Sequence, residues 1–172
     1  AIEDETGFPF LVPFREAVEA LLTHGSWSAD GLAWTLVQGD AARTVDQLQG
    51  PFDLVFHDPF SWEHNAPLWT LEFFGKLRAL CAPDAMLATY SSATPARVAL
   101  LLAGFFVGVG LPTGTRGETT VASPDRTRLA LPLGERWFLR WQRSTRKAPH
   151  GMEQPADLDA AVRSHVQFKD LK

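Results

Sequence analysis

The stretch from Phe52 to Ser61 constrains the fold of this chain more than any other part of the sequence. Its first half is mostly apolar, β-branched or aromatic, which is typical of a strand buried on both faces in a parallel sheet. A carboxylate, a proline and an aromatic ring follow at once, in Asp58, Pro59 and Phe60. Ligands of open α/β sheets bind beyond the carboxyl ends of the strands. Asp58 is therefore either a structural cap or the centre of a binding site.

Strand-like and helical segments alternate along residues 1–124, which indicates an α/β fold with a mostly parallel sheet between helices. The predicted strands are 1–4, 32–37, 52–56, 85–91, 105–109 and 118–122. The predicted helices are 14–23, 41–48, 70–80, 94–104, 134–145 and 156–166. Residues 24–31 are polar and predict a loop, and the last two strands predict an antiparallel hairpin. We expect an α/β domain over 1–124 and a basic, Trp-containing helical extension packed on it over 125–172.

The composition fits a cytoplasmic globular protein. The chain has 172 residues, 45% of them hydrophobic, which is enough for a sizeable core. It contains no apolar run of the roughly 18 residues that a membrane span needs, and its acidic first residues do not resemble a signal peptide. The single cysteine, Cys81, excludes an internal disulfide and is interpreted as a core thiol. With five scattered histidines beside it, no metal site is predicted.

The formal net charge of −4 conceals a strong asymmetry along the chain. Residues 1–65 carry eleven acidic residues and two basic ones, whereas residues 126–147 carry seven basic residues and one acidic residue. The second segment can bind a polyanion although the whole chain is acidic. The alternative is an ordinary solvated face, because Trp137 and Trp141 at i and i+4 also suit a helix docked on the core.

Acidic residues follow three of the predicted strands, at Glu3, Asp40 and Asp58. Acidic residues at the ends of neighbouring strands suit a nucleoside-type cofactor that lies across the edge of the sheet. In such folds one acid accepts hydrogen bonds from the ribose hydroxyls, and an acid after the next strand can accept one from an adenine amino group. The alternative is that these are ordinary loop acids at strand ends.

The dipeptide Asp58-Pro59 is the most specific of these signals. A proline holds the preceding residue in an extended conformation, so the Asp58 carboxylate is fixed, and Phe60 can stack on a flat base. A fixed acceptor can aim the lone pair of an amine at an electrophilic carbon. A helix-entry turn explains the same residues equally well. His57 is interpreted as a hydrogen-bonded histidine beneath a helix in preference to a general base, because it points away from Asp58.

Several ordered segments carry a resemblance to a known family. They are 53–61 (DLVFHDPFS), 65–70 (NAPLWT), 88–92 (ATYSS), 103–108 and 120–123. Together they resemble the S-adenosylmethionine-dependent MnmC-type tRNA 5-methylaminomethyl-2-thiouridine methyltransferases over about residues 32–123. The resemblance implies a Rossmann-like three-layer fold and transfer of a methyl group to the aminomethyl group of a modified wobble uridine in tRNA. It also implies an oxidase partner, either fused or separate.

The resemblance assigns roles to individual residues. Glu3 would hold the cofactor ribose, Gly39 and Asp40 its adenine side, and Asp58 would face the sulfonium and the incoming amine. Pro59 and Phe60 would line the site of methyl transfer. The substrate-binding residues expected from the sequence are Trp69, Arg116, Arg136 and Arg140, of which the last two lie outside the matched segments.

Three departures from the family pattern affect these expectations. The glycine-rich run 110–118 keeps only Arg116 as a basic residue, and the loop at 63–65 has lost the family's lysine. The arginines of 136–147 are a possible replacement, since arginine beside stacking aromatic rings suits RNA. The sequence also lacks a strand and glycine-rich turn before residue 1, so we expect the natural protein to extend upstream of Ala1.

Two other functions remain open at this stage. The chain can be a non-catalytic α/β module that binds RNA or a protein partner through residues 126–147. It can also be a nicotinamide-dependent oxidoreductase, which would share the ribose-binding acid but has no use for the Asp58-Pro59 dipeptide.

Overall fold

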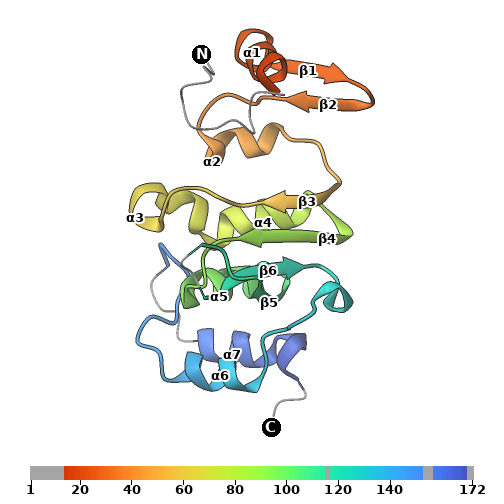
Figure 1. Ribbon diagram of the computed structural model, residues 1–172. Helices are drawn as coiled ribbons and strands as arrows, with labels where there is room; N and C mark the ends of the chain where they lie inside the picture. The colour runs from red at the N-terminus through yellow and green to blue at the C-terminus, as the bar shows by residue number, and fades with distance from the viewer. Residues whose placement is uncertain (1–13, 115–116, 153–156, 170–172) are drawn as a thin grey trace. The chain divides into compact units, whose positions relative to one another are not determined.

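The computed structural model describes residues 14–114, 117–152 and 157–169. Figure 1 shows their helices and strands in chain order. The chain divides into two compact units, Ala1–Thr44 and Val45–Lys172. Residue 124, where the sequence suggests that a basic extension begins, lies within the second unit.

The first unit contains an antiparallel hairpin between helices α1 (Arg15–His24) and α2 (Ala41–Thr44). Its strands are β1 (Ser26–Ala29) and β2 (Leu32–Thr35), with Trp27 opposite Trp34. The loop expected at 24–31 is wrong, because β1 lies within it, and the strand expected at 32–37 pairs with β1 outside the parallel sheet. The two-residue turn Asp30-Gly31, with positive φ at both residues, produces this hairpin.

The second unit contains a four-stranded sheet in the order β3 (Phe52–Phe56), β4 (Cys81–Thr89), β6 (Thr119–Ser123) and β5 (Phe106–Gly110). Strand β3 is parallel to β4, and β6 is antiparallel to both β4 and β5. Three strands therefore run in one direction, and only the closing strand runs in the other. This arrangement confirms the mostly parallel α/β sheet with an antiparallel closing hairpin.

Strand β3 differs from expectation in its burial. The side chains of Leu54 and Phe56 are 53% and 76% exposed, although both were expected in the core. Both side chains lie on the same face of β3, because successive residues of a strand point to opposite faces. The alternate residues Val55 and His57 point into the unit, so β3 is buried on one face only.

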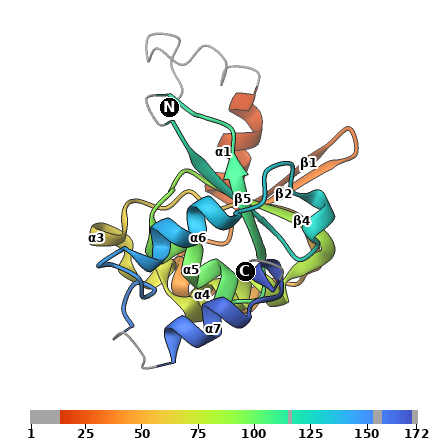
Figure 2. The same ribbon diagram turned by 90° about the horizontal axis from the view of Figure 1, so that it is seen from below.

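Helices α4 (Leu71–Ala79), α5 (Thr94–Leu102) and α7 (Leu158–Ser164) pack in series, with α5 in contact with both neighbours. Figure 2 shows the three helices grouped together. The Thr70 hydroxyl caps α4, because it accepts a hydrogen bond from the Phe73 N–H. Ala93 is the N-cap residue of α5, and Thr94 is the first residue of the helix.

Residues beyond 124 complete the core and cover the free edge of β5. Helix α6 (Glu135–Gln142) buries Trp137 and Trp141, and α7 buries Leu158 and Val162. The segment 131–133 runs beside β5, with the Val109 N–H donating to the Leu131 carbonyl oxygen at 2.8 Å. A Cβ atom at Gly108 would lie 2.8 Å from the same oxygen, so this approach requires glycine.

Candidate active site

The loop after β3 is held by hydrogen bonds between the backbone of Phe60 and two side chains. The Phe60 N–H donates to Asn65 Oδ1 at 3.0 Å, and the Phe60 carbonyl oxygen accepts from Trp69 Nε1 at 2.9 Å. Asn65 ends the short helix α3 (Trp62–Asn65), and Trp69 ends the 3₁₀ turn η4 (Ala66–Trp69). These bonds fix the Asp58-Pro59-Phe60 segment while the Phe60 ring stays 77% exposed.

The buried side chain of His57 supports this loop from the core. Its Nε2 donates to the Leu68 carbonyl oxygen at 2.9 Å, and its Nδ1 lies 3.4 Å from the Thr89 hydroxyl. Burial lowers the pKa of His57 from 6.5 to about 4, outweighing the carbonyl of Leu68 and the carboxylate of Asp58, which raise it. The ring is therefore neutral at physiological pH. This confirms a hydrogen-bonded buried histidine, as the sequence analysis preferred.

Two adjoining hollows open at the carboxyl ends of β3 and β4, and Asp58 and Tyr90 line both of them. One, of about 440 Å³, is also lined by Thr89 at the end of β4 and by Thr119 at the start of β6. The other, of about 710 Å³, is formed with the loop and α3. Asp58 is exposed between them, so its carboxylate can reach a ligand in either hollow.

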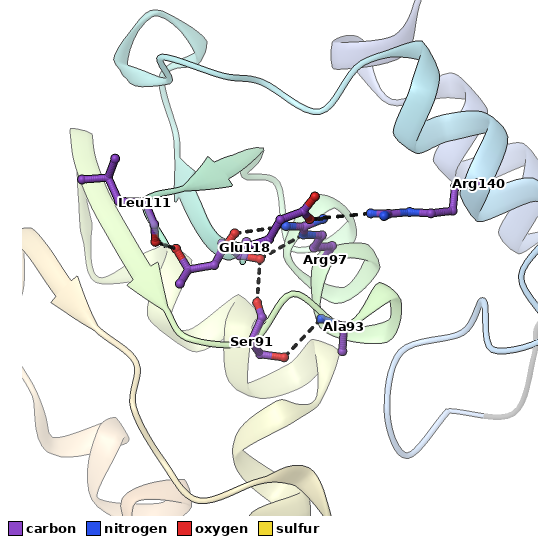
Figure 3. Close-up of polar contacts among 8 residues, drawn as sticks. Ser91, Ala93, Arg97, Leu111, Glu118 and Arg140 are labelled. Atoms are coloured by element: carbon purple, nitrogen blue, oxygen red, sulfur yellow. Dashed lines mark hydrogen bonds and ion pairs between the residues drawn. The ribbon is translucent and has the colours of Figure 1, made fainter. Parts of the chain in front are cut away.

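A buried arginine holds the wall of the first hollow. Arg97, on α5, is fully buried and donates to Thr120 Oγ1 at 2.9 Å, the Thr119 carbonyl oxygen at 3.0 Å and Glu118 Oε2 at 3.2 Å. The Thr120 hydroxyl in turn donates to the carbonyl oxygen of Ser91 at 2.6 Å, beside Tyr90. Figure 3 shows this chain of contacts. Burial lowers the pKa of Arg97, and Glu118 partly restores it.

Asp40 lies in the first unit, where its side chain contacts residues two and three positions further along the chain. Its Oδ1 accepts a hydrogen bond from the Ala42 N–H at 3.0 Å at the start of α2, and Oδ2 lies 3.8 Å from the Arg43 Nε. Gly39 has φ +142°, and a Cβ atom there would lie 2.9 Å from the Thr44 side chain. Their cofactor contacts stay predictions.

The remaining expected site residues fall into three groups. Glu3 and Arg116 lie outside the described residues. Trp69 is only 2% exposed and holds the loop through its ring nitrogen, a position that favours support over direct substrate contact. Arg136 and Arg140 lie on the exposed side of α6, and their contact with substrate stays a prediction.

Tyr90 and Arg97 were missed by the sequence analysis. Tyr90 follows β4 directly, so the rule that selected Asp58 after β3 selects it too. Arg97 is the only charged residue of α5, in the otherwise apolar helix TPARVALLL. A lone charge in such a helix indicates a buried group that requires a partner.

No group of metal-binding side chains occurs within residues 14–114, 117–152 and 157–169. Over the same ranges, no helix combines the length and apolar character needed to cross a membrane.

Comparison with known proteins identifies the class to which this site belongs. A family model described as "S-adenosyl-L-methionine-dependent methyltransferase" matches residues 17–125, well over half of the chain. The chain therefore belongs to the S-adenosyl-L-methionine-dependent methyltransferase family, as the resemblance implied. This membership names the cofactor and favours a methyltransferase over a nicotinamide-dependent oxidoreductase.

Similar individual proteins narrow the class further. Two are named "tRNA 5-methylaminomethyl-2-thiouridine biosynthesis bifunctional protein MnmC". The protein from Pseudomonas savastanoi pv. phaseolicola is 34% identical over 71% of this chain and 18% of its own length. The protein from Pseudomonas aeruginosa is 30% identical over 83% of this chain and 22% of its own length. The chain thus spans about a fifth of these relatives.

A solved structure agrees with this assignment. The crystal structure of "MNMC2" from Aquifex aeolicus matches 92% of this chain and 52% of that chain, with a TM-score of 0.66 and 27% identity. The expected methyltransferase fold of the MnmC type is therefore confirmed.

Proposed function

We propose that this chain transfers a methyl group from S-adenosylmethionine to an amine, the aminomethyl group of a modified wobble uridine in tRNA. The names of the MnmC relatives support the choice of substrate. One observation carries the proposal: the Asp58 carboxylate lies between two hollows at the carboxyl ends of β3 and β4. The loop that carries it is held by hydrogen bonds to the N–H and to the carbonyl oxygen of Phe60.

The side chains around Asp58 fit the reacting end of this cofactor. A sulfonium is a compact cation, and cations are attracted to carboxylates and to the faces of aromatic rings. Asp58 supplies the carboxylate, while Phe60 and Tyr90 supply rings beside it. Gly39 and Asp40 would hold the adenine side and Glu3 the ribose, as the resemblance implies.

When bound, S-adenosylmethionine would supply an electrophilic methyl group on a positively charged sulfur; its transfer to an amine would form the N–C bond as the C–S bond breaks and would leave that electron pair on sulfur. Asp58 accepts a hydrogen bond from an N–H of the neutral amine and thereby aims the lone pair at the methyl carbon. The methylated nitrogen then loses a proton to water. Neutral His57 holds the loop and does not take part in proton transfer.

Transfer of labelled methyl groups to tRNA carrying the aminomethyl uridine tests this role. Asp58→Asn keeps the size of the side chain but removes its charge, and we expect the kcat for transfer to fall by about 100-fold, within the range for a positioned acid or base. Asp53→Asn is the matched control, because Asp53 is an exposed carboxylate on β3, the strand before the loop, and does not line either hollow. It should leave kcat unchanged.

An Asp58→Asn variant that transfers methyl groups at the wild-type rate would exclude Asp58 from the reaction. Incorporation into tRNA that lacks the aminomethyl group, at the same rate, would show that the substrate assignment is wrong. An oxidase partner, fused or separate, would fit the word "bifunctional" in the names of the relatives.

A further inference from the structure

A groove lined by arginines lies on the exposed face of α6. Arg136, Arg140 and Arg143 recur at i, i+4 and i+7, so one face of the helix presents all three. They line a hollow of about 500 Å³ together with Thr94, Leu139 and Ser144. None of these six residues is acidic, although the chain as a whole has a net charge of −4.

The helix that carries these arginines is fixed in place. Trp137 and Trp141 on its opposite face are 5% and 0% exposed, with ring centroids 6.5 Å apart, and Trp137 also stacks on Phe168. The tryptophans thus dock the helix, while the arginines face solvent.

Two of the arginines are free to bind a ligand. In the part of the chain that the structure describes, the Arg136 and Arg143 guanidinium groups have no hydrogen-bond or ion-pair partner. Arg140 lies 3.8 Å from Glu118 and keeps 59% of its side chain exposed. Guanidinium groups form paired hydrogen bonds with phosphate oxygens, and the Thr94 hydroxyl beside them can donate a further one.

The groove is linked to the candidate active site through Glu118. Glu118 Oε2 accepts from the buried Arg97 at 3.2 Å and lies near Arg140, as Figure 3 shows. Arg97 also binds the carbonyl oxygen of Thr119, the residue that lines the hollow beside Asp58. These contacts therefore connect the groove with the wall of the hollow beside Asp58.

From this charge, exposure and linkage we infer that the α6 groove is the docking surface for the sugar–phosphate backbone of an RNA substrate. The inference rests on the proposed function, which requires a nucleic acid to be held while one base reacts. The three arginines contact phosphates, and Glu118 with Arg97 sets the distance between those phosphates and the Asp58 loop. Contacts of this kind position a nucleic acid and do not read its sequence.

Binding of fluorescent tRNA to the full chain at several salt concentrations tests the inference. The Arg136→Gln/Arg143→Gln double variant should lose about 30-fold in affinity at 0.1 M salt, and the slope of log K against log salt should become shallower by about 1.5. The matched control is Arg126→Gln/Arg128→Gln, which removes the same charge from exposed arginines of the turn η5 (Arg126–Arg128), outside the groove. It should lose much less affinity and keep most of the slope.

Equal losses in the two double variants would overturn the inference, because the binding would then follow overall charge and not the groove. Absence of tRNA binding by the wild-type chain would also overturn it and would favour an acidic protein as the partner. Binding of S-adenosylhomocysteine, measured on the same samples, separates these outcomes from failure of the proposed function. It should be equal in the wild type and both double variants.

Discussion

The His57 ring lies among three aromatic side chains, with its centroid 4.7 Å from Trp69, 5.0 Å from Phe74 and 5.9 Å from Phe73. Both ring nitrogens face oxygen atoms of the protein, at Leu68 and Thr89. A charged imidazolium in this place would lose its hydration, so the folded protein holds the ring neutral. The side chain thus joins the core to the loop that carries Asp58.

This burial makes the stability of the protein depend on pH. The pKa of His57 is about 4 in the folded chain against 6.5 for an exposed histidine, so the unfolded chain binds the proton first as the pH falls. The neutral ring contributes fully above pH 6.5, and its contribution is lost as the pH falls toward 4. We expect a loss of about 3 kcal/mol from this group between pH 7 and pH 4.

Urea unfolding of wild type and His57→Gln between pH 4 and 7 measures this effect. Glutamine keeps a donor for the Leu68 carbonyl oxygen but does not titrate, so its profile should be flatter by that amount. His64→Gln, at an exposed position, should follow the wild type. Parallel profiles for wild type and His57→Gln would contradict the assignment of a neutral buried ring.

At the scale of elements, a glutamine completes the hydrogen bonding at the outer edge of the sheet, next to the segment 131–133. Gln167, in the last turn η6 (Val166–Phe168), accepts from the Val107 N–H at 2.8 Å and donates to the carbonyl oxygens of Val107 and Leu133 at 2.7 and 2.9 Å. Its amide thus takes the place of a neighbouring strand for one residue of β5. The C-terminal extension is joined to the sheet by this residue as well as by its apolar contacts.

Gln167→Leu should therefore destabilise the protein although leucine is more apolar. It leaves the buried Val107 N–H without a partner, and we expect a loss of about 2–3 kcal/mol in the free energy of unfolding. Gln49→Leu, at an exposed position, should change it by less than about 0.5 kcal/mol. Denaturant unfolding checks both, and equal stabilities of the two variants would show that the Gln167 amide contributes nothing.

The sequence predicted most elements of the second unit, because their local signals agree with their environment. Thr70 and the apolar positions after it specify α4, and the glycine-rich run between two β-branched segments specifies the closing hairpin. The first unit was predicted less well. The turn Asp30-Gly31 was present in the sequence as a hairpin signal but was interpreted as part of a loop, which placed β2 in the wrong sheet.

At the scale of the whole molecule, the sequence located the centre of the candidate site but not its walls. Asp58, Pro59 and Phe60 were identified because strand ends of α/β sheets are where ligands bind. The Arg97–Glu118–Arg140 contacts join residues far apart in the chain, and nothing in the local sequence specifies such pairs. Burial of β3 was misjudged because apolar composition does not tell whether one face of a strand is covered or both.

The central claim is that the Asp58 loop faces the sulfonium of S-adenosylmethionine, and calorimetric titration of the chain with this cofactor and with S-adenosylhomocysteine tests it most directly. Loss of a charge-assisted contact in Asp58→Ala should weaken binding of S-adenosylmethionine about 10-fold, and should weaken binding of S-adenosylhomocysteine, which lacks the sulfonium charge, less. Asp53→Ala should bind both ligands as the wild type does. A wild-type chain that binds neither ligand, or an Asp58→Ala variant with wild-type affinity for S-adenosylmethionine, would contradict the account.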